Sequence, residues 1–415
     1  MDLFLTNDEG HIKYIRCLSS RSAFITKSKK VYDLFSNNGL LEGVLIGCDF
    51  SLELQFEFAL DRLRNINFFP ERLYCFSESL MQLSGLLREF FGIAGLDAHT
   101  ATILRNKIKM KDVLSQKGFR CPRYILGDKI GSFCDFQSNS QNIVIKPILG
   151  SNSENCMLIK PEDFDSKLLA ANLDYASIII EEYIDGAEYH ADALVAKDGK
   201  VIFSCVSKDL YPMIRVTHDG AICGSVTSNK FGYTEKKILD ILNDIITSLG
   251  IKRSIVHAEF LQGENSNEIY VSEIAGRPGG DKIVDNIRNV FGVDIIEKHI
   301  LESKDELTMP IGIPNDTTKA GAYILLPIKK GIVLDFTSRS ILENTEGVVD
   351  AKYNYRRGDE AHLPEWLIRL NANPKNGIAK GRYNFGHVLI VCENVERCIK
   401  VSEEVFSKFS LVTLE

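Results

Sequence analysis

The chain of 415 residues has a formal net charge of −7, with 45% hydrophobic and 25% charged residues. These values are ordinary for a globular protein, and the length is enough for about two or three domains with large cores. An acidic chain without a basic run lacks the electrostatic footprint of nucleic-acid binding. The composition therefore fits an enzyme and argues against a nucleic-acid partner.

The amino terminus and the cysteines predict a reducing compartment. Residues Met1 to Glu9 are acidic and lack the basic region that begins a signal peptide. No apolar run reaches the length of a membrane span. The ten cysteines are scattered without a C-x-x-C pair, which argues against a zinc site and against a disulfide framework. We therefore expect a cytoplasmic protein that has no membrane partner.

The first hundred residues alternate between strand and helix patterns. The apolar runs are 43–49 and 72–76, and the helical patterns are 52–64 and 77–92. The second helical pattern ends in glycine, which often terminates a helix. Such alternation predicts a small parallel α/β domain. A further helix is expected from about Ala101 to Lys117, just before Gly118.

The rest of the chain mixes strands and helices without an internal repeat. Strands are expected at 142–147, 176–183, 320–327 and 386–392, and helices at 233–249, 285–302 and 395–408. Residues 187–230 are expected to form antiparallel strands, with turns at Lys197-Asp-Gly-Lys and His218-Asp-Gly. The stretch 351–382 is long and irregular, and we predict a loop or lid there.

Lys146 and the loop that follows it are candidates for phosphate binding. The segment is Ile143-Val-Ile-Lys146-Pro-Ile-Leu-Gly150-Ser151-Asn-Ser153, in which a lysine at a strand end precedes a loop of small residues. Backbone N–H groups of such a loop can cradle phosphate oxygens, and the lysine adds a fixed charge. A plain surface turn is the alternative, because the P-loop pattern G-x-x-x-x-G-K-[ST] is absent.

Two other segments are candidates for nucleotide contacts. Lys107 lies at a helix start in Asn-Lys-Ile-Lys-Met-Lys, where a solvated basic face is the alternative. The strand of Glu181 leads into a bend that reaches Glu188, and such a hinge can offer backbone groups to an adenine. Glu188 is then placed to accept hydrogen bonds from ribose hydroxyls. The alternative for Glu188 is an ordinary acid at a strand edge.

Glu259 and Glu273 lie on a predicted hairpin whose turn is near Asn265 or Ser266. Both flanks alternate and are rich in β-branched and aromatic residues. The two carboxylates should then be opposite each other or one pair apart, on one face with His257 and Val271. Like charges repel unless a cation lies between them, and carboxylates are the ligands that Mg²⁺ prefers. A solvated hairpin face with two unrelated acids is the alternative.

Arg277 follows the second of these glutamates in Glu273-Ile-Ala-Gly-Arg277-Pro-Gly-Gly. The Pro-Gly-Gly break ends the strand, brings backbone close to a ligand and frees the arginine to point into a cleft. A guanidinium beside a metal site suits a phosphoryl group in transfer, whose charge needs neutralisation. The alternative is a surface ion pair followed by a plain turn.

In this order the motifs resemble the ATP-grasp superfamily, and in particular its carboxylate–amine ligases of the L-amino acid ligase type. The motifs are Asn106-Lys107 with Met110, Gly118-Phe-Arg-Cys-Pro122, Lys146-Pro with Gly150-Ser151, Glu181-Glu-Tyr-Ile-Asp-Gly-Ala-Glu188, Glu259, and Glu273 to Arg277-Pro-Gly-Gly. They cover about residues 40–300. Each motif is short, but the ordered set is specific.

The resemblance implies an ATP-grasp fold, of the α/β and α+β classes, in which two lobes clasp ATP. It predicts an N-terminal α/β pre-ATP-grasp domain at 1–100, a small lobe at 101–185, a large lobe with the metal site at 186–310, and a C-terminal α+β lobe at 311–415. The tail fits the family by architecture rather than by motif.

The resemblance also assigns roles to particular residues. Phosphates of ATP would be bound by Lys107, Lys146, Gly150, Ser151 and Ser153, adenine by Glu181, Glu182 and Ile184, ribose by Glu188, Mg²⁺ or Mn²⁺ by Glu259 and Glu273, and the acyl phosphate by Arg277. His257 would hold a substrate or phosphate, or else be a packed residue. Many family members carry a metal-binding asparagine where this chain has Ala275. The number of magnesium ions therefore stays open.

The activity implied is ATP-dependent joining of a small carboxylate, such as an amino acid, to an amine. The carboxylate would form an acyl phosphate with release of ADP, and the amine would then displace phosphate. One alternative is another ATP-grasp chemistry, either bicarbonate activation as in biotin carboxylases or a purine-pathway ligation. The other is a nonenzymatic nucleotide-binding protein, against which the complete residue set argues. A homodimer is a further expectation.

Overall fold

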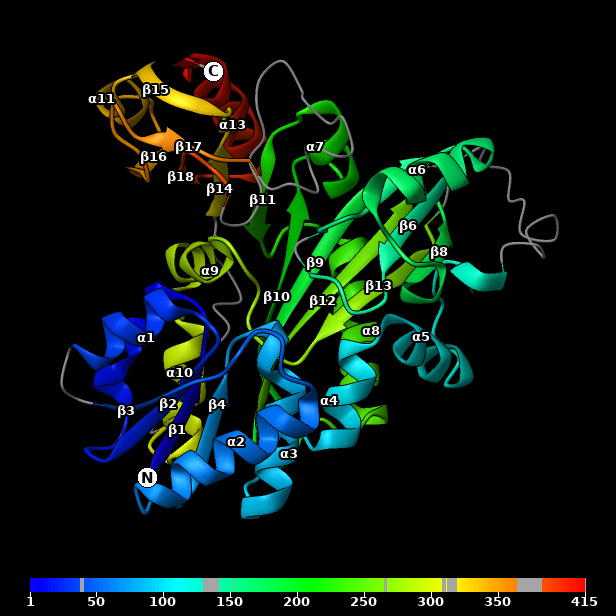
Figure 1. The fold of residues 1–415 in the computed structure, drawn as a ribbon. Coiled ribbons are helices and arrows are strands. Elements are labelled where there is room, and N and C mark those ends of the chain that lie inside the picture. Colours follow the sequence, from blue (N-terminus) through cyan, green and yellow to red (C-terminus); the bar gives the residue numbers. More distant parts are fainter. Residues whose placement is uncertain are drawn as a thin grey trace.

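The structure is a computed structural model that describes residues 1–37, 41–129, 142–151, 153–264, 267–307, 311, 319–363 and 383–414. In Figure 1 the N-terminal domain (blue), a small lobe and the C-terminal part (orange to red) surround a long central sheet. Within the part of the chain described, no helix is long and apolar enough to cross a membrane.

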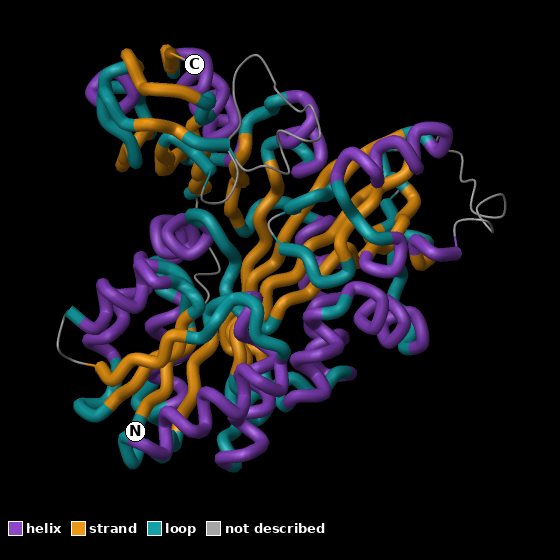
Figure 2. The backbone as a smooth tube through the Cα atoms, viewed as in Figure 1, coloured by secondary structure: helices purple, strands orange, loops and turns teal. Residues whose placement is uncertain are grey.

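The N-terminal domain is the parallel α/β domain that the sequence predicts. Its sheet has the order β3-β2-β1-β4, and all of its strand pairs are parallel. The strands are β1 Asp2–Leu5, β2 Ser22–Thr26, β3 Leu41–Leu45 and β4 Arg72–Cys75. The helices are η1 Glu9–Cys17, α1 Lys29–Ser36, α2 Leu52–Asn65, η2 Glu78–Leu80 and α3 Met81–Phe91, and they flank the sheet in Figure 2.

The single helix predicted from Ala101 to Lys117 is wrong, because two helices occupy this region. They are α4 Ala98–Arg105 and α5 Lys107–Gln116. Asn106 has extended backbone angles, and its side chain accepts hydrogen bonds from the N–H groups of Ile108 and Lys109. An asparagine that caps a helix in this way ends the preceding one. Lys107 is therefore the first residue of a helix.

The small lobe is an antiparallel sheet of order β5-β8-β6-β7. Its strands are β5 Tyr124–Leu126, β6 Ile143–Pro147, β7 Met157–Ile159 and β8 Ile178–Glu182. Helix α6 Phe164–Ala171 and the turns η4 Pro161–Asp163 and η5 Tyr175–Ser177 complete it. The strands predicted at 142–147 and 176–183 are confirmed.

The central sheet has eight strands in the order β13-β12-β9-β10-β11-β14-β18-β16. They are β9 Gly186–Val195, β10 Val201–Asp209, β11 Cys223–Ser228, β12 Ser254–Gly263, β13 Ile269–Ala275, β14 Ala320–Leu326, β16 Val348–Tyr353 and β18 Gly386–Cys392. Apolar side chains on one face, such as Val256 and Phe260, pack with α4, α5 and α8 Tyr233–Ser248. The sheet runs on across the predicted domain boundary at residue 310.

The remaining elements correct several predictions. Helix α7 Met213–Asp219 lies where only strands and turns were predicted, and the single helix predicted at 285–302 is two helices, α9 Ile283–Phe291 and α10 Ile295–Ser303. They are separated at Gly292, whose φ of 70° suits glycine. Within 351–382, β16 ends and β17 Glu360–Ala361 pairs with β15, while 364–382 lies outside the described residues.

The C-terminal part adds a second, smaller sheet of order β17-β15-β19. Its longer strands are β15 Gly331–Phe336 and β19 Leu411–Leu414, and the accompanying helices are α11 Arg339–Glu343 and α13 Val395–Lys408. Helix α13 packs on β14 and β18 through buried Cys398, Val401 and Val405. The helix predicted at 395–408 is confirmed.

Candidate active site

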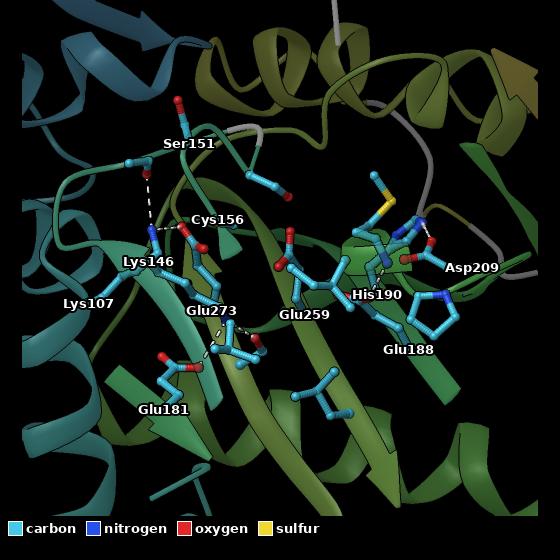
Figure 3. Close-up of a pocket in the computed structure, with 18 of the residues that line it drawn as sticks. Lys107, Lys146, Ser151, Cys156, Glu181, Glu188, His190, Asp209, Glu259 and Glu273 are labelled. Atoms are coloured by element: carbon cyan, nitrogen blue, oxygen red, sulfur yellow. Dashed lines mark hydrogen bonds and ion pairs between the residues drawn. The ribbon is translucent and has the colours of Figure 1, made fainter. Parts of the chain in front are cut away.

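One pocket lies between the small lobe and the central sheet, and every site residue predicted from the sequence lines it. These residues are Lys107, Lys146, Gly150, Ser151, Ser153, Glu181, Glu182, Ile184, Glu188, Glu259, Glu273 and Arg277. Figure 3 shows lysines and glutamates from different elements pointing toward one another around this space. Since they come from α5, β6, β8, β9, β12 and β13, only the tertiary fold brings them together.

The two predicted metal-binding carboxylates are directly opposite each other, which is one of the two arrangements that the hairpin pattern predicts. Glu259 on β12 pairs with Glu273 on β13 in the antiparallel register. A β-bulge follows, because Phe260 then pairs with Val271 and the intervening Ser272 is left over. Val271 is consequently buried in the core, so its predicted place on the carboxylate face is wrong. Ser272 lines the pocket instead.

A cation lies beside each of these carboxylates. Oε1 of Glu273 is 3.0 Å from Nζ of Lys107, and Oε1 of Glu259 is 3.8 Å from Nε2 of His257. Burial alone would raise the pKa of Glu259, but His257, Lys146 and Lys107 outweigh it and lower that pKa. The lowered pKa keeps the Glu259 carboxylate charged on this hairpin, and the oxygens of the two carboxylates suit a hard divalent cation.

Lys146 ends strand β6 and is held by the neighbouring sheets. Its Nζ is 3.0 Å from Oε2 of Glu181 and donates to Oγ of Ser272 at 3.3 Å. Burial opposes the charged form, but the Glu181 carboxylate outweighs burial and raises the pKa of Lys146. Lys146 is therefore a fixed cation. The loop after it turns at once, with the Gly150 N–H donating to the Pro147 carbonyl.

The loop at Gly150 is tied to the region of α4 and α5. Nζ of Lys107 donates to the Gly150 carbonyl at 3.0 Å, and so does Arg105, whose guanidinium also contacts the Leu149 carbonyl. The loop of small residues that was predicted to contact phosphate thus starts beside two cations. Sequence reasoning did not single out Arg105.

Arg277 leaves β13 and is anchored to the N-terminal domain. Its Nε lies 2.5 Å from Oε2 of Glu78, and one Nη donates to the Pro278 carbonyl at 2.7 Å. The following glycine packs closely, since a Cβ at Gly279 would lie 2.9 Å from Nδ1 of His257. The guanidinium therefore lines the pocket in a fixed orientation.

His257 belongs to a buried network on the floor of the pocket. Nδ1 of His257 is 2.9 Å from one carboxylate oxygen of Asp192, and Nδ1 of His190 is 3.0 Å from the other. Nε2 of His190 lies 3.0 Å from Oγ of Ser225. Burial would lower the pKa of His257, but Asp192 and Glu259 raise it to about 10. His257 is thus a protonated imidazole ring fixed in position by Asp192, and it also lines the pocket.

The residues predicted to contact adenine and ribose also line the pocket, with Glu181 beside Lys146 and the others further along the same segment. Glu188 accepts a hydrogen bond from the Met213 N–H at 2.7 Å, so α7 contacts the strand that carries it. Glu182 is engaged by Arg123 through the backbone N–H and Nε, at 2.8 and 2.9 Å. Tyr183 and Ile184 follow in the bend. No ligand contact is implied by these bonds, and the assigned roles stay predictions.

Comparisons with known proteins agree with this arrangement. Residues 139–286 match the model of the ATP-grasp domain. The L-arginine-specific L-amino acid ligase of Bacillus subtilis is 27% identical over 303 residues, which cover 68% of this chain and 69% of that protein. The alanine–anticapsin ligase of the same organism is 24% identical over 237 residues, or 50% of this chain and 48% of that protein.

A solved structure covers the whole length. The L-amino acid ligase from Bacillus licheniformis has a TM-score of 0.76 at 15% identity, covering 100% of this chain and 98% of that one. The chain therefore carries an ATP-grasp domain. Its fold is the predicted ATP-grasp fold, with mixed helices and sheets.

Several charged residues that the sequence did not single out lie in or around the pocket of this ATP-grasp domain, and His190 is the one of them that lines it. Asp192 and His190 lie within β9, Glu78 is in a short turn, and Lys111 is one helical turn after Lys107. Asp192 and His190 alternate with Ala191, which faces the opposite, apolar side. This period of two was a usable signal for a polar face in β9.

Replacing Lys146 by alanine should weaken ATP binding by about one to two orders of magnitude, since a charge-assisted hydrogen bond contributes about 1.5–3 kcal/mol. Titration calorimetry with a nonhydrolysable ATP analogue measures this. Lys160→Ala, at a side chain 59% exposed on the same lobe, is the matched control and should bind as the parent does. Unchanged affinity in Lys146→Ala would contradict the phosphate role.

Proposed function

We propose that this ATP-grasp protein activates a small carboxylate, in the first place that of an amino acid, as an acyl phosphate and joins it to an amine with release of ADP and phosphate. The observation that carries the proposal is the convergence of Lys107, Lys146 and Arg277 on the paired carboxylates of Glu259 and Glu273. Phosphoryl transfer depends on such positioning and neutralisation of charge. The names of the curated relatives, both amino acid ligases, support the substrate class.

The donor set fits a magnesium nucleotide. Two opposed carboxylates offer hard oxygen ligands, and phosphate oxygens would complete the shell of Mg²⁺ or Mn²⁺. When bound, the ion would neutralise charge on the phosphates and orient them. The lysines and the loop Gly150, Ser151 and Ser153 would hold the phosphates. The backbone groups of the bend with Glu181, Glu182 and Ile184 would hold adenine, since both carboxylate oxygens of Glu181 already contact lysines, and Glu188 would hold ribose.

The chain's own residues account for the two chemical steps. In the first, a carboxylate oxygen attacks the γ-phosphorus, and the fixed cations Lys146 and Arg277 neutralise the charge on the phosphoryl group in transfer. In the second, the amine nitrogen attacks the acyl carbon and phosphate leaves. The acyl phosphate is open to hydrolysis, so a pocket that closes between two lobes protects it from water.

The remaining expectations belong to the same proposal. The proposed division at 100, 185 and 310 is into an N-terminal domain, a small lobe, a large lobe and a C-terminal lobe, although helix α4 crosses the first boundary and the central sheet crosses the last. A homodimer, a cytoplasmic location and small-molecule partners without nucleic acid or membrane remain predictions. The two alternative ATP-grasp chemistries are outcomes of the experiment below.

Incubation with MgATP and pairs of amino acids should release ADP and phosphate and yield a dipeptide, detected by mass. Adding hydroxylamine in place of the amine should trap the activated carboxylate as a hydroxamate, because hydroxylamine attacks an acyl phosphate. The hydroxamate should require ATP. Formation of AMP and pyrophosphate would overturn the acyl-phosphate route, and ADP release that depends on bicarbonate alone would favour the carboxylase-like alternative.

A further inference from the structure

Lys111 is a cation enclosed within the protein directly behind the nucleotide pocket. It lies on α5 one turn after Lys107, its side chain is 0% exposed, and it is not among the residues that line the pocket. A lysine is almost never fully buried unless it is paired. Its surroundings must therefore explain why it is there.

The Lys111 ammonium group forms an ion pair and a hydrogen bond. Nζ lies 3.1 Å from Oε1 of Glu181 and donates to the Ser272 carbonyl at 3.1 Å. The other oxygen of Glu181, Oε2, is 3.0 Å from Nζ of Lys146, and Oγ of Ser272 also contacts that Nζ. Lys111 thus contacts both residues that hold Lys146, Glu181 through its carboxylate and Ser272 through its carbonyl, and it does not line the pocket itself.

The charges of this cluster explain what Lys111 contributes. A single carboxylate paired only with Lys146 would cancel the charge of that lysine in a medium of low dielectric. Because Glu181 is shared by two lysines, the cluster as a whole keeps one positive charge. Of its two cations, only Lys146 lines the pocket, so the surplus charge acts there on any anion. Burial opposes ionisation of Glu181, but Lys111 and Lys146 together lower its pKa.

We propose that Lys111 is a positioning residue for nucleotide phosphates: it neutralises Glu181 from behind, so that the charge of Lys146 remains available to the ligand. This rests on the proposed function only in taking a nucleotide phosphate as the anion. Lys111 itself touches neither nucleotide nor substrate. Lys107 has no such arrangement, because its partner Glu273 is expected to turn to the metal ion instead.

The test is the affinity for MgADP, measured by titration calorimetry on the full chain. Lys111→Met keeps most of the side-chain volume and removes the charge, and the dissociation constant should rise about tenfold or more. The double variant Lys111→Met with Glu181→Gln removes both charges and keeps a carbonyl acceptor for Lys146. Its dissociation constant should return to within about threefold of the parent value, because Lys146 is again uncompensated.

This recovery of affinity separates an electrostatic role of Lys111 from a merely structural one. If Lys111→Met weakened binding by disturbing the packing, a second substitution in the core would not restore the affinity. Arg88→Met is the matched control, since Arg88 is another buried cation, in the N-terminal domain, bonded to Ser84 and to the Leu73 and Leu96 carbonyls. It should lower thermal stability and leave MgADP binding unchanged. If Lys111→Met is too unstable to measure, Lys111→Gln takes its place, because it also removes the charge but keeps a donor for the Ser272 carbonyl.

Several outcomes would overturn the assignment. One is a Lys111→Met variant whose dissociation constant for MgADP lies within about twofold of the parent value. The other is a double variant that binds MgADP about tenfold more weakly than the parent does. A parent protein that does not bind MgADP would remove both this inference and the proposed function. A parent that binds MgADP but forms no amide with any carboxylate and amine would remove the proposed function alone, since binding needs neither substrate.

Discussion

Replacing Glu273 or Glu259 by glutamine should abolish magnesium-dependent turnover. The amide keeps the shape of the side chain but loses the charge that a hard divalent cation requires. Mutating a residue that only hydrogen-bonds to a metal ligand typically lowers metal affinity or activity about 10- to 100-fold. Loss of a direct ligand should therefore lower the rate by more than about a hundredfold. The measurement is ADP release at saturating MgATP, repeated over a range of magnesium concentrations.

The same hairpin supplies a matched control. Glu268→Gln changes an acid of the same strand pair that is 46% exposed and paired with Arg120, outside the pocket. It should turn over at the parent rate. Both pocket variants should remain folded, because the partner cations Lys107 and His257 have further bonds, to the Gly150 carbonyl and to Asp192. Parent rates in both pocket variants would remove the metal assignment.

Arg277→Lys should retain ATP binding and lose turnover. A lysine keeps the charge, but a single ammonium group cannot hold Glu78 and the Pro278 carbonyl and still present a planar fork to a phosphoryl group. Arginines that serve phosphoryl transfer contribute about 10³ to 10⁵ in kcat, so we expect a fall of about a hundredfold or more. Calorimetry with an ATP analogue and the steady-state rate of ADP release measure the two effects separately.

The control for this substitution is Arg339→Lys on α11, at a side chain 59% exposed and paired with Glu343. It should change neither affinity nor rate. A rate for Arg277→Lys close to the parent value would show that charge alone suffices there. A loss of ATP binding in proportion to the loss of rate would instead assign Arg277 to nucleotide binding.

Local patterns in the sequence predicted those features that depend on neighbouring residues. The alternation in both flanks of the hairpin predicted Glu259 opposite Glu273 or one pair apart, and the structure has them opposite. The glycine–serine loop after Lys146 was recognised by composition alone. The failures arise where one residue changes the register. Asn106 interrupts a long helical pattern, and the bulge at Ser272 moves Val271 to the other face of the sheet. A period of two or 3.6 cannot show such a single-residue interruption.

The sequence could not show which residues from distant segments contact each other. Glu78 meets Arg277 across 199 positions, and Lys111 meets the Ser272 carbonyl across 161. In the sequence, Lys111 is one of four cations between Arg105 and Lys111 and resembles a solvated face. Only tertiary packing decides which of these charges is enclosed. Asp192 gave some signal, because its strand alternates, but its two histidine partners lie on two different strands.

The continuity of the central sheet has a consequence for the chain as a whole. Strand β14 pairs with β11 over Cys223 to Thr227, and β11 also carries Ser225, which contacts His190 beneath the pocket. A protein ending before β14 would expose the full hydrogen-bonding edge of β11, and bare edges of this kind pair with other molecules. The C-terminal part is therefore integral to the ligand-binding half of the sheet, because its strand β14 covers the edge of β11 and protects that edge from pairing with other molecules.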